Sequence, residues 1–272
     1  MTDTAVPAKA MRIGFVGVGH MGRPMVDRLV AAGWPTEVYV RRPERRAELE
    51  SAGVGVAGSP HELAARSDVL ILCLFSDAQV REVMLDDAVL ESMRPGSVLV
   101  SHVTGSPALA VDLQAAAPEG VTVLDVPISG TDDHIRRGEL TLMVGGDPAA
   151  LDRIRPALAS YCNPILHVGG LGDGQRIKLI NNLLFTVHLK VALQGAALAG
   201  SMGIPADEFA RIVSECSGDS FAIRLFQRVP PETLASGARH YLVKDVSVIR
   251  EVAAAQGIEL GELGELANWV FE

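Results

Sequence analysis

Lys178 and Asn182 are the two side chains of this chain whose types and spacing best suit proton chemistry. They follow a glycine-rich stretch at 169–174, which we expect to be a flexible loop, and they open a segment without glycine or proline from 175 to 194. Such a segment predicts one long helix, on which residues four apart share a face. Lys178 could exchange a proton with a substrate while the amide of Asn182 orients one of the two groups. Spacing alone leaves the alternative of a surface lysine near the start of a helix.

A second glycine-rich stretch has the spacing of a dinucleotide site. Residues 13–22 read IGFVGVGHMG, which places a GxGxxG sequence between a predicted strand and a predicted helix. The first glycine permits a tight turn, the second lets the backbone approach a pyrophosphate, and the third allows close packing of helix and strand. An ordinary glycine-rich turn is the alternative. The residues of this loop that we expect to contact the cofactor are Gly17, Val18, Gly19, His20, Met21 and Gly22.

The end of the second predicted strand bears on the choice between NAD and NADP. An acidic residue at that place binds the ribose 2′-hydroxyl of NAD, whereas arginine accommodates the 2′-phosphate of NADP. Here Arg41 and Arg42 follow the strand, and no carboxylate stands at that place. A solvated basic helix start is the alternative, although cations at a helix N-terminus oppose the helix dipole. We therefore predict that NADPH is the preferred cofactor, with NAD also a candidate.

A third stretch, residues 125–131 (DVPISGT), follows another predicted strand. Open α/β sheets bind their ligands beyond the carboxyl ends of the strands. The hydroxyls of Ser129 and Thr131, with the backbone N–H groups around Gly130, could hold a carboxylate there. A purely structural turn is the alternative.

The elements that would position these residues follow from the hydrophobic pattern. Up to residue 168, short β-branched runs alternate with amphipathic segments, as in an α/β fold with a doubly wound parallel sheet. The predicted strands are 12–16, 36–40, 68–74, 97–101, 121–125, 140–144 and 164–168. The predicted helices are 20–32, 44–52 and 107–117 and, beyond residue 172, 175–202, 206–215, 242–256 and 261–271. We expect a disordered tail at 1–10, a Rossmann-type domain at 11–172 and an all-helical domain at 173–272.

Composition narrows the class of protein. The chain has 272 residues, of which 48% are hydrophobic, and can therefore form a substantial core. Its net charge of −9 argues against a nucleic-acid or anionic-membrane surface. The three cysteines lie far apart and form no metal-ligand cluster, so we expect no disulfide, no metal site and a reducing cytoplasm. The segment 183–202 is long and apolar, but His188, Lys190 and Gln194 interrupt it, so we expect a buried helix rather than a membrane span.

These stretches together resemble the β-hydroxyacid dehydrogenase family, which includes 3-hydroxyisobutyrate dehydrogenase and relatives of 6-phosphogluconate dehydrogenase. The motifs that occur in the family's order and spacing are GVGHMG, DVPISGT, GELTLMVGG at 138–146, GLGDGQRIKLINN at 170–182 and the pair Lys244-Asp245. The resemblance implies that Lys178 is the catalytic acid/base and that Asn182 assists it.

The resemblance has further implications for the substrate site and the assembly. It implies that Ser129 and Gly130 bind the carboxylate of a small substrate, with Thr131 next to them. It also implies that Lys244 lies near both cofactor and substrate, with Asp245 beside it. The long helix would then mediate a homodimer, or a dimer of dimers.

The sequence departs from the family pattern in the substrate turn. Thr131 replaces the family's second glycine, and Asp132, Asp133 and His134 follow where small residues are usual. This crowds the turn and adds negative charge, which would repel a second carboxylate or a phosphate on the substrate. A monocarboxylate, or a substrate with a cationic end, fits such an edge.

Further departures fall on the nicotinamide side and near the C-terminus. Residues 101–107 read SHVTGSP where the family commonly has DMSTxSP, and Phe75-Ser76 replaces a usual Leu-Pro pair. We expect Phe75, Ser76 and Thr104 to line the nicotinamide side, whereas His102 and His134 could either approach substrate or be structural. The family's aromatic before the Lys-Asp pair is not clearly matched, and the candidates are Tyr241 and Phe226.

The sequence thus predicts an NADP-preferring oxidoreductase that transfers hydride between nicotinamide and a small 3-hydroxyacid, or its aldehyde or keto form. An imine reductase is one alternative, because it shares this architecture, but such relatives usually replace the lysine that is Lys178 here. A catalytically silent NADPH-binding dimerisation module is another. The altered substrate turn favours the silent module, and Lys178 and Asn182 count against it.

Overall fold

The computed structural model describes residues 11–272. The tail predicted at 1–10 lies outside the described residues. The chain divides into two compact units, Met1–Lys178 and Leu179–Glu272. The division falls within one long helix, close to the predicted boundary at residue 172.

The first unit is built on a nine-stranded sheet with the order β3-β2-β1-β4-β5-β6-β8-β7, and β9 also pairs with β8. Its strands are β1 (Ile13–Val16), β2 (Thr36–Tyr39), β3 (Gly55–Val56), β4 (Val69–Leu72), β5 (Val98–Ser101), β6 (Thr122–Asp125), β7 (Ile128–Ser129), β8 (Leu140–Gly145) and β9 (Cys162–Gly169). All the predicted strands are present. The sequence did not predict β3 and β7, which have only two residues each and carry no readable alternation.

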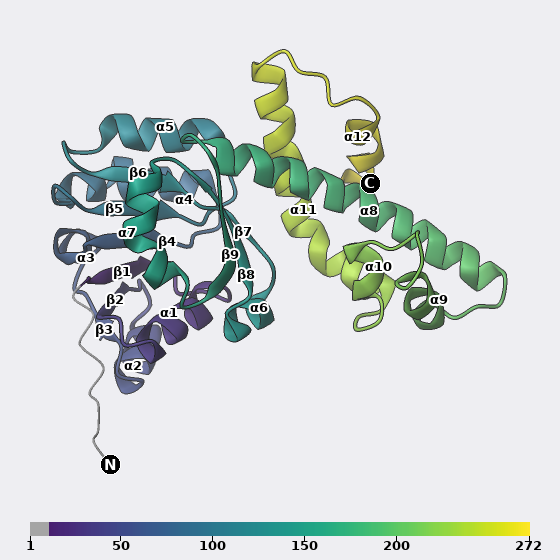
Figure 1. Ribbon diagram of the computed structural model, residues 1–272, viewed down its shortest axis with the longest axis horizontal. Helices are drawn as coiled ribbons and strands as arrows, with labels where there is room; N and C mark the ends of the chain where they lie inside the picture. Colours follow the sequence, from purple (N-terminus) through teal and green to yellow (C-terminus); the bar gives the residue numbers. More distant parts are fainter. Residues whose placement is uncertain (1–10) are drawn as a thin grey trace. The chain divides into compact units, whose positions relative to one another are not determined.

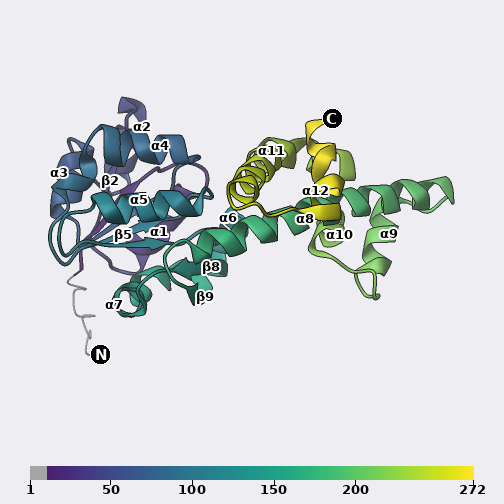
Figure 2. The ribbon, with the colours of Figure 1, turned by 90° about the horizontal axis from the view of Figure 1, so that it is seen from above.

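Helices cover both faces of this sheet (Figure 1). They are α1 (Gly22–Ala31), α2 (Pro43–Ser51), α3 (Pro60–Arg66), α4 (Asp77–Arg81), α5 (Pro107–Ala116), α6 (Asp132–Arg137) and α7 (Pro148–Leu158), with the short π-helix η1 (Glu82–Asp86) and the short 3₁₀ helix η2 (Val89–Ser92). Figure 2 shows α3 and α5 on one side of the sheet and α7 on the other. The Rossmann-type α/β fold predicted from the alternating pattern is confirmed.

The alternation of side chains along the buried strands explains this two-sided packing. In β4, Val69 and Ile71 belong to the core under α1 and α7, whereas Leu70 and Leu72 belong to the core under α3 and α5. Successive side chains of a strand point to opposite faces, so a fully apolar strand needs cover on both sides.

The predicted doubly wound parallel sheet is mixed at one edge. Strands β1 to β6 pair in parallel, but β8 runs antiparallel to β6 and to β7. A parallel return needs a crossover of about a dozen residues or more, usually with a helix packed on the sheet. Here β7 and the short helix α6 fill the connection between β6 and β8, which brings the chain back in the opposite direction.

The second unit is helical, as the sequence predicted. It contains α9 (Ala206–Val213), α10 (Phe221–Leu225), α11 (Pro231–Ala255), α12 (Gly261–Leu266) and the turn η3 (Ala267–Phe271), packed on α8 (Asp173–Ser201). The helix predicted at 242–256 begins earlier, at Pro231, and the segment 261–271 is a helix followed by a 3₁₀ turn rather than one helix. Pro231 stands at the first helical position, where the missing N–H has no helical partner to lose.

The C-terminal turn is bound to α8 and α11 by side-chain hydrogen bonds to backbone carbonyls. Trp269 Nε1 donates to Thr186 O at 3.1 Å, and Arg239 Nε donates to Val270 O at 2.9 Å. Phe226, one of the two candidate aromatics, is 3% exposed and belongs to this core, whereas Tyr241 is exposed.

Candidate active site

The glycine loop between β1 and α1 is shaped to receive a pyrophosphate. A Cβ atom on Gly17 would lie 2.2 Å from the carbonyl oxygen of Cys73, the residue after β4, and one on Gly22 would lie 2.1 Å from Gly17 O, so neither position admits a side chain. By contrast, nothing lies within 4 Å of a Cβ built on Gly19. The open space therefore falls at the glycine whose backbone would face the phosphates, beside the N-terminus of α1.

The other predicted cofactor residues follow the carboxyl ends of neighbouring strands. In the strand order, β1 and β4 are adjacent and their following helices lie on opposite faces, which is where such sheets bind nucleotides. Phe75 and Ser76 come after β4, and Ser76 Oγ caps α4 by accepting from Gln79 N at 3.4 Å. Thr104 comes after β5 and is half-buried.

The arginines after β2 divide into two pairs. Arg45 pairs with Glu48 at 2.8 Å, and Arg46 Nη2 donates to Ala57 O at 2.5 Å, so both contribute to the fold of α2. Arg41 and Arg42 are exposed in the loop that precedes this helix. Arg41 forms a long ion pair of 4.0 Å with Glu82, and its exposed guanidinium could turn towards a ligand.

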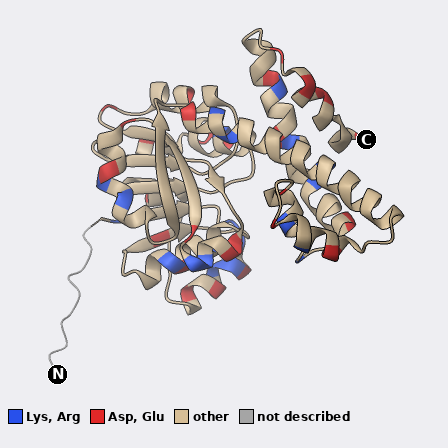
Figure 3. Cartoon of the chain, turned by 45° about the vertical axis from the view of Figure 1, so that its right-hand side comes forward, with Lys and Arg blue, Asp and Glu red and all other residues tan. Residues whose placement is uncertain are grey.

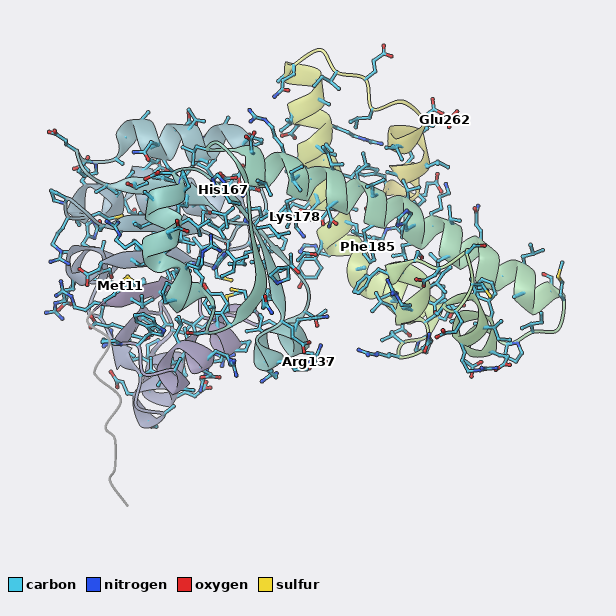
Figure 4. All side chains as sticks on the ribbon, viewed as in Figure 1. Met11, Arg137, His167, Lys178, Phe185 and Glu262 are labelled. Carbon is cyan, nitrogen blue, oxygen red and sulfur yellow. The ribbon has the colours of Figure 1, made fainter. Side chains whose placement is uncertain are left out.

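Lys178 lies in the second turn of α8 and is buried, with 8% of its surface exposed (Figure 4). The alternative of a solvated surface lysine is therefore wrong. The expectation of a flexible loop before the helix is also wrong, because Gly172 N donates to Asp125 Oδ1 at 2.7 Å and Gly170 N donates to Asp173 Oδ2 at 2.8 Å. These bonds fix the entry to α8, which begins at Asp173.

The substrate turn is built from β7 and the start of α6. Ser129 pairs with Thr141 of β8, and Gly130 is exposed between this strand and the helix. Thr131 is the N-cap of α6, and Thr131 N donates to His134 Nδ1 at 3.1 Å in a capping box. His134 thus has a structural role, and the departure at Thr131 produces a helix start rather than an open glycine turn.

Asp132 in the first turn of α6 is already engaged. Its carboxylate lies 3.2 Å from Arg136 Nη2 and 3.6 Å from Nε2 of His20, a residue of the cofactor loop. Desolvation raises the pKa of Asp132, but the hydrogen bond from Arg136 and the nearby His20 and Arg136 together lower it by more, so the pKa lies below its usual value. Asp133, which is exposed, keeps its charge available at this edge.

His102 is a buried structural residue. Its Nδ1 lies 2.7 Å from Val126 O and its Nε2 lies 2.8 Å from the hydroxyl of Tyr161. Because a carbonyl oxygen only accepts, Nδ1 carries the proton and Nε2 accepts from Tyr161. Burial lowers the pKa of His102 to about 4, so the ring stays neutral in the folded protein.

We expect His102 to make the protein less stable in mild acid. Below about pH 6.5 the His102 ring takes up a proton in the unfolded chain but stays neutral in the folded protein. The free energy of unfolding therefore falls by about 1.4 kcal/mol per pH unit until the pKa of His102 in the folded protein is reached. The free energy of unfolding of the wild type, relative to that of His102→Met, should therefore fall by about 2 kcal/mol between about pH 6.5 and pH 5. Urea unfolding at several pH values measures it.

The effect of the His102 ring can be separated from the contributions of Asp125 and Tyr161. Burial raises the pKa of Asp125 to about 6, which acts in the opposite direction, but this contribution is common to both proteins and cancels in their difference. His102→Met/Tyr161→Phe is the control for the tyrosine hydroxyl left without an acceptor. A difference that is independent of pH would contradict the assignment.

In the second unit, the residues predicted from the family motifs, Asn182, Lys244 and Asp245, form a small network. Asn182 Nδ2 donates to Asp245 Oδ2 at 2.5 Å, and Lys244 Nζ lies 3.0 Å from Asp245 Oδ1. Asp245 is buried, whereas Asn182 and Lys244 are half-buried. The carboxylate thus holds an amide and an ammonium side by side.

The sequence did not predict roles for Asp125 and Gln175, which connect the end of β6, the start of α8 and the loop after β5. The carboxylate of Asp125 accepts from Gly172 N and, at 2.8 Å, from Gln175 N. The Gln175 side chain bonds the loop after β5. The signal in the sequence was a carboxylate at the end of a largely apolar strand. Among residues 11–272, no group of three or more His, Cys, Asp or Glu side chains could hold a metal ion.

Comparison with protein families covers both units. Residues 12–169 match the NAD binding domain of 6-phosphogluconate dehydrogenase, and residues 172–271 match the NAD-binding domain of NADP-dependent 3-hydroxyisobutyrate dehydrogenase. The chain belongs to the β-hydroxyacid dehydrogenase family. The resemblance inferred from the motifs is confirmed, and the protein is an NAD(P)-dependent oxidoreductase of the hydroxyacid dehydrogenase type.

Individual members of the β-hydroxyacid dehydrogenase family are similar over most of their length. The probable 3-hydroxyisobutyrate dehydrogenase-like 3 of Arabidopsis thaliana is 32% identical over 91% of this chain and 78% of that protein. An NAD-dependent L-serine dehydrogenase of Pseudomonas aeruginosa is 32% identical over 90% of this chain and 86% of that protein. Among solved structures, Mycobacterium tuberculosis 3-hydroxyisobutyrate dehydrogenase with L-serine has a TM-score of 0.84 and 29% identity, covering 96% of this chain and 92% of that chain.

Imine reductases share the architecture at a greater distance. The V8 variant of an imine reductase from Myxococcus stipitatus has a TM-score of 0.68 but only 20% identity, over 96% of this chain and 93% of that chain. This likeness extends to the fold alone.

Proposed function

We propose that the protein transfers hydride between NADP and a small 3-hydroxycarboxylate, or its aldehyde or keto form, with Lys178 as the acid/base. The observation that carries the proposal is the burial of this lysine in the same compact unit as the glycine loop and the Ser129 turn. An imine reductase remains the second candidate on fold, and Lys178 argues against it.

The residues of this chain would divide the work of alcohol oxidation. The bound nicotinamide supplies the hydride acceptor. Lys178 Nζ takes the hydroxyl proton as the carbonyl forms, and it returns that proton in the reverse reaction. Ser129 Oγ and the N–H groups near Gly130 hold the substrate carboxylate, which fixes the carbinol carbon. Asn182, whose Nδ2 is held by Asp245, assists from the next turn of α8.

The preference for NADP rests on Arg41 and Arg42. Both are exposed after the second strand, and a guanidinium matches a phosphate monoester by paired hydrogen bonds. The first carboxylate beyond the strand is Glu44, already inside α2. The Pseudomonas relative is named as NAD-dependent, so the arginines carry this part of the proposal without support from that protein.

The substrate class follows from charge at the altered turn. Asp133 is exposed and Asp132 keeps a low pKa, so a second anionic group on the substrate would be repelled. A 3-hydroxycarboxylate that is neutral or cationic at carbon 2 fits this edge. L-serine, which appears in the names of the Pseudomonas relative and the Mycobacterium structure, has that form.

A substrate panel tests the proposed function. The wild-type protein would be assayed with 3-hydroxycarboxylates, their aldehydes and cyclic imines, with NADP(H) and NAD(H) in parallel. Turnover of the hydroxy acids with the higher kcat/KM for NADP is expected. Turnover of imines alone would favour the imine reductase, and cofactor binding without turnover would favour the silent module.

We also propose that the chain forms a homodimer through α8. The side chains of Ile177, Leu184, Val191 and Leu198 recur every seven residues and are all exposed, by 45%, 38%, 54% and 58%. A seven-residue apolar repeat is the pattern by which two helices pack along a common seam. In Figure 3 this helix carries few charged segments.

The same helix has the length and composition of a membrane span, with a mean hydropathy of 1.4 and 39% of its most apolar stretch buried. Lys190 lies within that stretch of helix, where a charge is costly in a bilayer, so we favour a second copy of the chain as the cover. The three cysteines are free thiols, which suits a reducing compartment, and we propose the cytoplasm.

Val191→Glu is expected to convert the dimer into a monomer. A carboxylate placed on the apolar seam would lie against its symmetry mate, and burying it without a partner costs several kcal/mol. Light scattering after gel filtration gives the mass directly. Val111→Glu is the control, because Val111 on α5 is exposed to a similar degree, 51% against 54%. A dimer that persists in Val191→Glu, or a wild-type monomer, would contradict the proposed interface.

A further inference from the structure

Gln175 connects the first turn of α8 to the loop that follows β5. Its Nε2 donates to Val103 O at 2.7 Å and its Oε1 accepts from Gly105 N at 2.9 Å. The side chain is 3% exposed. Thr104 lies between the two bonded residues, so both ends of the segment predicted to line the nicotinamide side are held by one amide group.

Asp125, at the end of β6, also holds the first turn of α8. Its two carboxylate oxygens accept from Gly172 N and Gln175 N, which caps the helix with a residue from the end of β6. A Cβ atom on Gly174 would lie 2.7 Å from both Asp125 Oδ2 and Met143 O, so the backbone of the helix rests directly on the ends of β6 and β8. The first turn therefore has no room to shift along the sheet.

Lys178 follows Gln175 by three residues on this anchored helix, and both side chains are buried. Residues three apart are neighbours on one helix face. Any rotation or translation of the first turn would therefore move Lys178 relative to the loop of Thr104. A misplacement of about 1 Å in a reacting group can lower a rate by about a hundredfold.

We propose that Gln175 is a positioning residue that sets the acid/base Lys178 against the nicotinamide side of the site. Asp125 orients the backbone of the helix, and the Gln175 amide fixes the loop to it. This inference rests on the proposed function, because it concerns the same lysine. It adds a positioning role for a side chain whose amide bonds the backbone of Val103 and Gly105.

The chain offers a matched comparison in Gln114. Its Nε2 donates to Val121 O at 3.0 Å and its Oε1 accepts from Val123 N at 2.8 Å, so it also connects a helix to neighbouring backbone with two bonds. These bonds lie towards the amino end of β6, away from the ligand-binding edge. Loss of Gln114 should cost stability without displacing any group of the site.

The test compares Gln175→Met with Gln114→Met in the full-length protein. For Gln175→Met we expect kcat to fall by about 10- to 100-fold, while the Kd for NADPH and the KM for the hydroxy acid change little. For Gln114→Met we expect a similar loss of thermal stability with wild-type kcat. Equal effects of the two substitutions on kcat, or wild-type kcat in Gln175→Met, would overturn the proposal.

A second measurement separates this proposal from the proposed function. Hydrogen–deuterium exchange of the amides at 103–105 and 172–178 needs no substrate. Faster exchange in both segments of Gln175→Met, but not of Gln114→Met, supports the coupling even if no hydroxy acid is turned over, in which case only the proposed function fails. Unchanged exchange at 103–105 would overturn the role of Gln175 whatever the activity.

Discussion

Lys178→Met is expected to lower kcat by about 100- to 10,000-fold, the usual contribution of a positioned acid/base. Methionine keeps the length of the side chain and fills the buried site, but it cannot carry a proton. Binding of NADPH should stay at the wild-type level, because the glycine loop and the arginines are untouched. Steady-state kinetics and fluorescence titration of the cofactor give both quantities.

The matched control for this substitution is Lys190→Met, which makes the same change farther along α8. It should leave kcat close to wild type. Because Lys178 is buried, unfolding curves of the variant accompany the kinetics and show that the protein remains folded. Near-normal turnover by folded Lys178→Met would refute the assigned role.

Arg41→Ala/Arg42→Ala is expected to weaken NADPH binding by about 10- to 100-fold, because a hydrogen bond to a charged phosphate contributes about 1.5 to 3 kcal/mol. Binding of NADH, which lacks the 2′-phosphate, should change little or improve slightly. The Kd values for both cofactors, measured by fluorescence titration at a fixed ionic strength, give the comparison.

Arg45→Ala serves as the control for charge alone, since its guanidinium pairs with Glu48 within α2 and the pair is exposed. It removes a positive charge from the same helix start without removing a predicted phosphate ligand. Equal weakening of NADPH and NADH by the double substitution, or no weakening of either, would count against the arginines as the basis of cofactor preference.

The sequence predicted the architecture because the decisive signals were local. Buried parallel strands such as β4 are continuous apolar runs, and long helices such as α8 lack glycine and proline over many residues. The antiparallel return of β8 was not predictable in this way. It depends on how the short connection through β7 and α6 folds back, and a hydrophobic pattern does not encode strand direction.

The candidate site was predictable where a residue stands inside a motif, and not where its role depends on a distant partner. Lys178 and Gly17 are marked by their spacing to neighbours in the sequence. Asp125 and Gln175 lie 50 residues apart, and Gln175 bonds Gly105 across 70 residues, so their roles appear only when the strand ends are brought together. His102 was left open for the same reason, since its acceptor and donor come from other strands and loops.

Transfer of the hydride from the substrate to the nicotinamide can be followed directly with deuterium. The wild-type protein would be given NADP⁺ and a 3-hydroxycarboxylate that carries deuterium on the carbinol carbon, and the reduced nucleotide would be analysed by mass spectrometry. We expect NADPH that contains the deuterium at C4 of the nicotinamide, formed about 100- to 10,000-fold more slowly by Lys178→Met. Reduced nucleotide without deuterium, or no reduction of NADP⁺ or NAD⁺ by any 3-hydroxycarboxylate tested, would contradict the proposed hydride transfer.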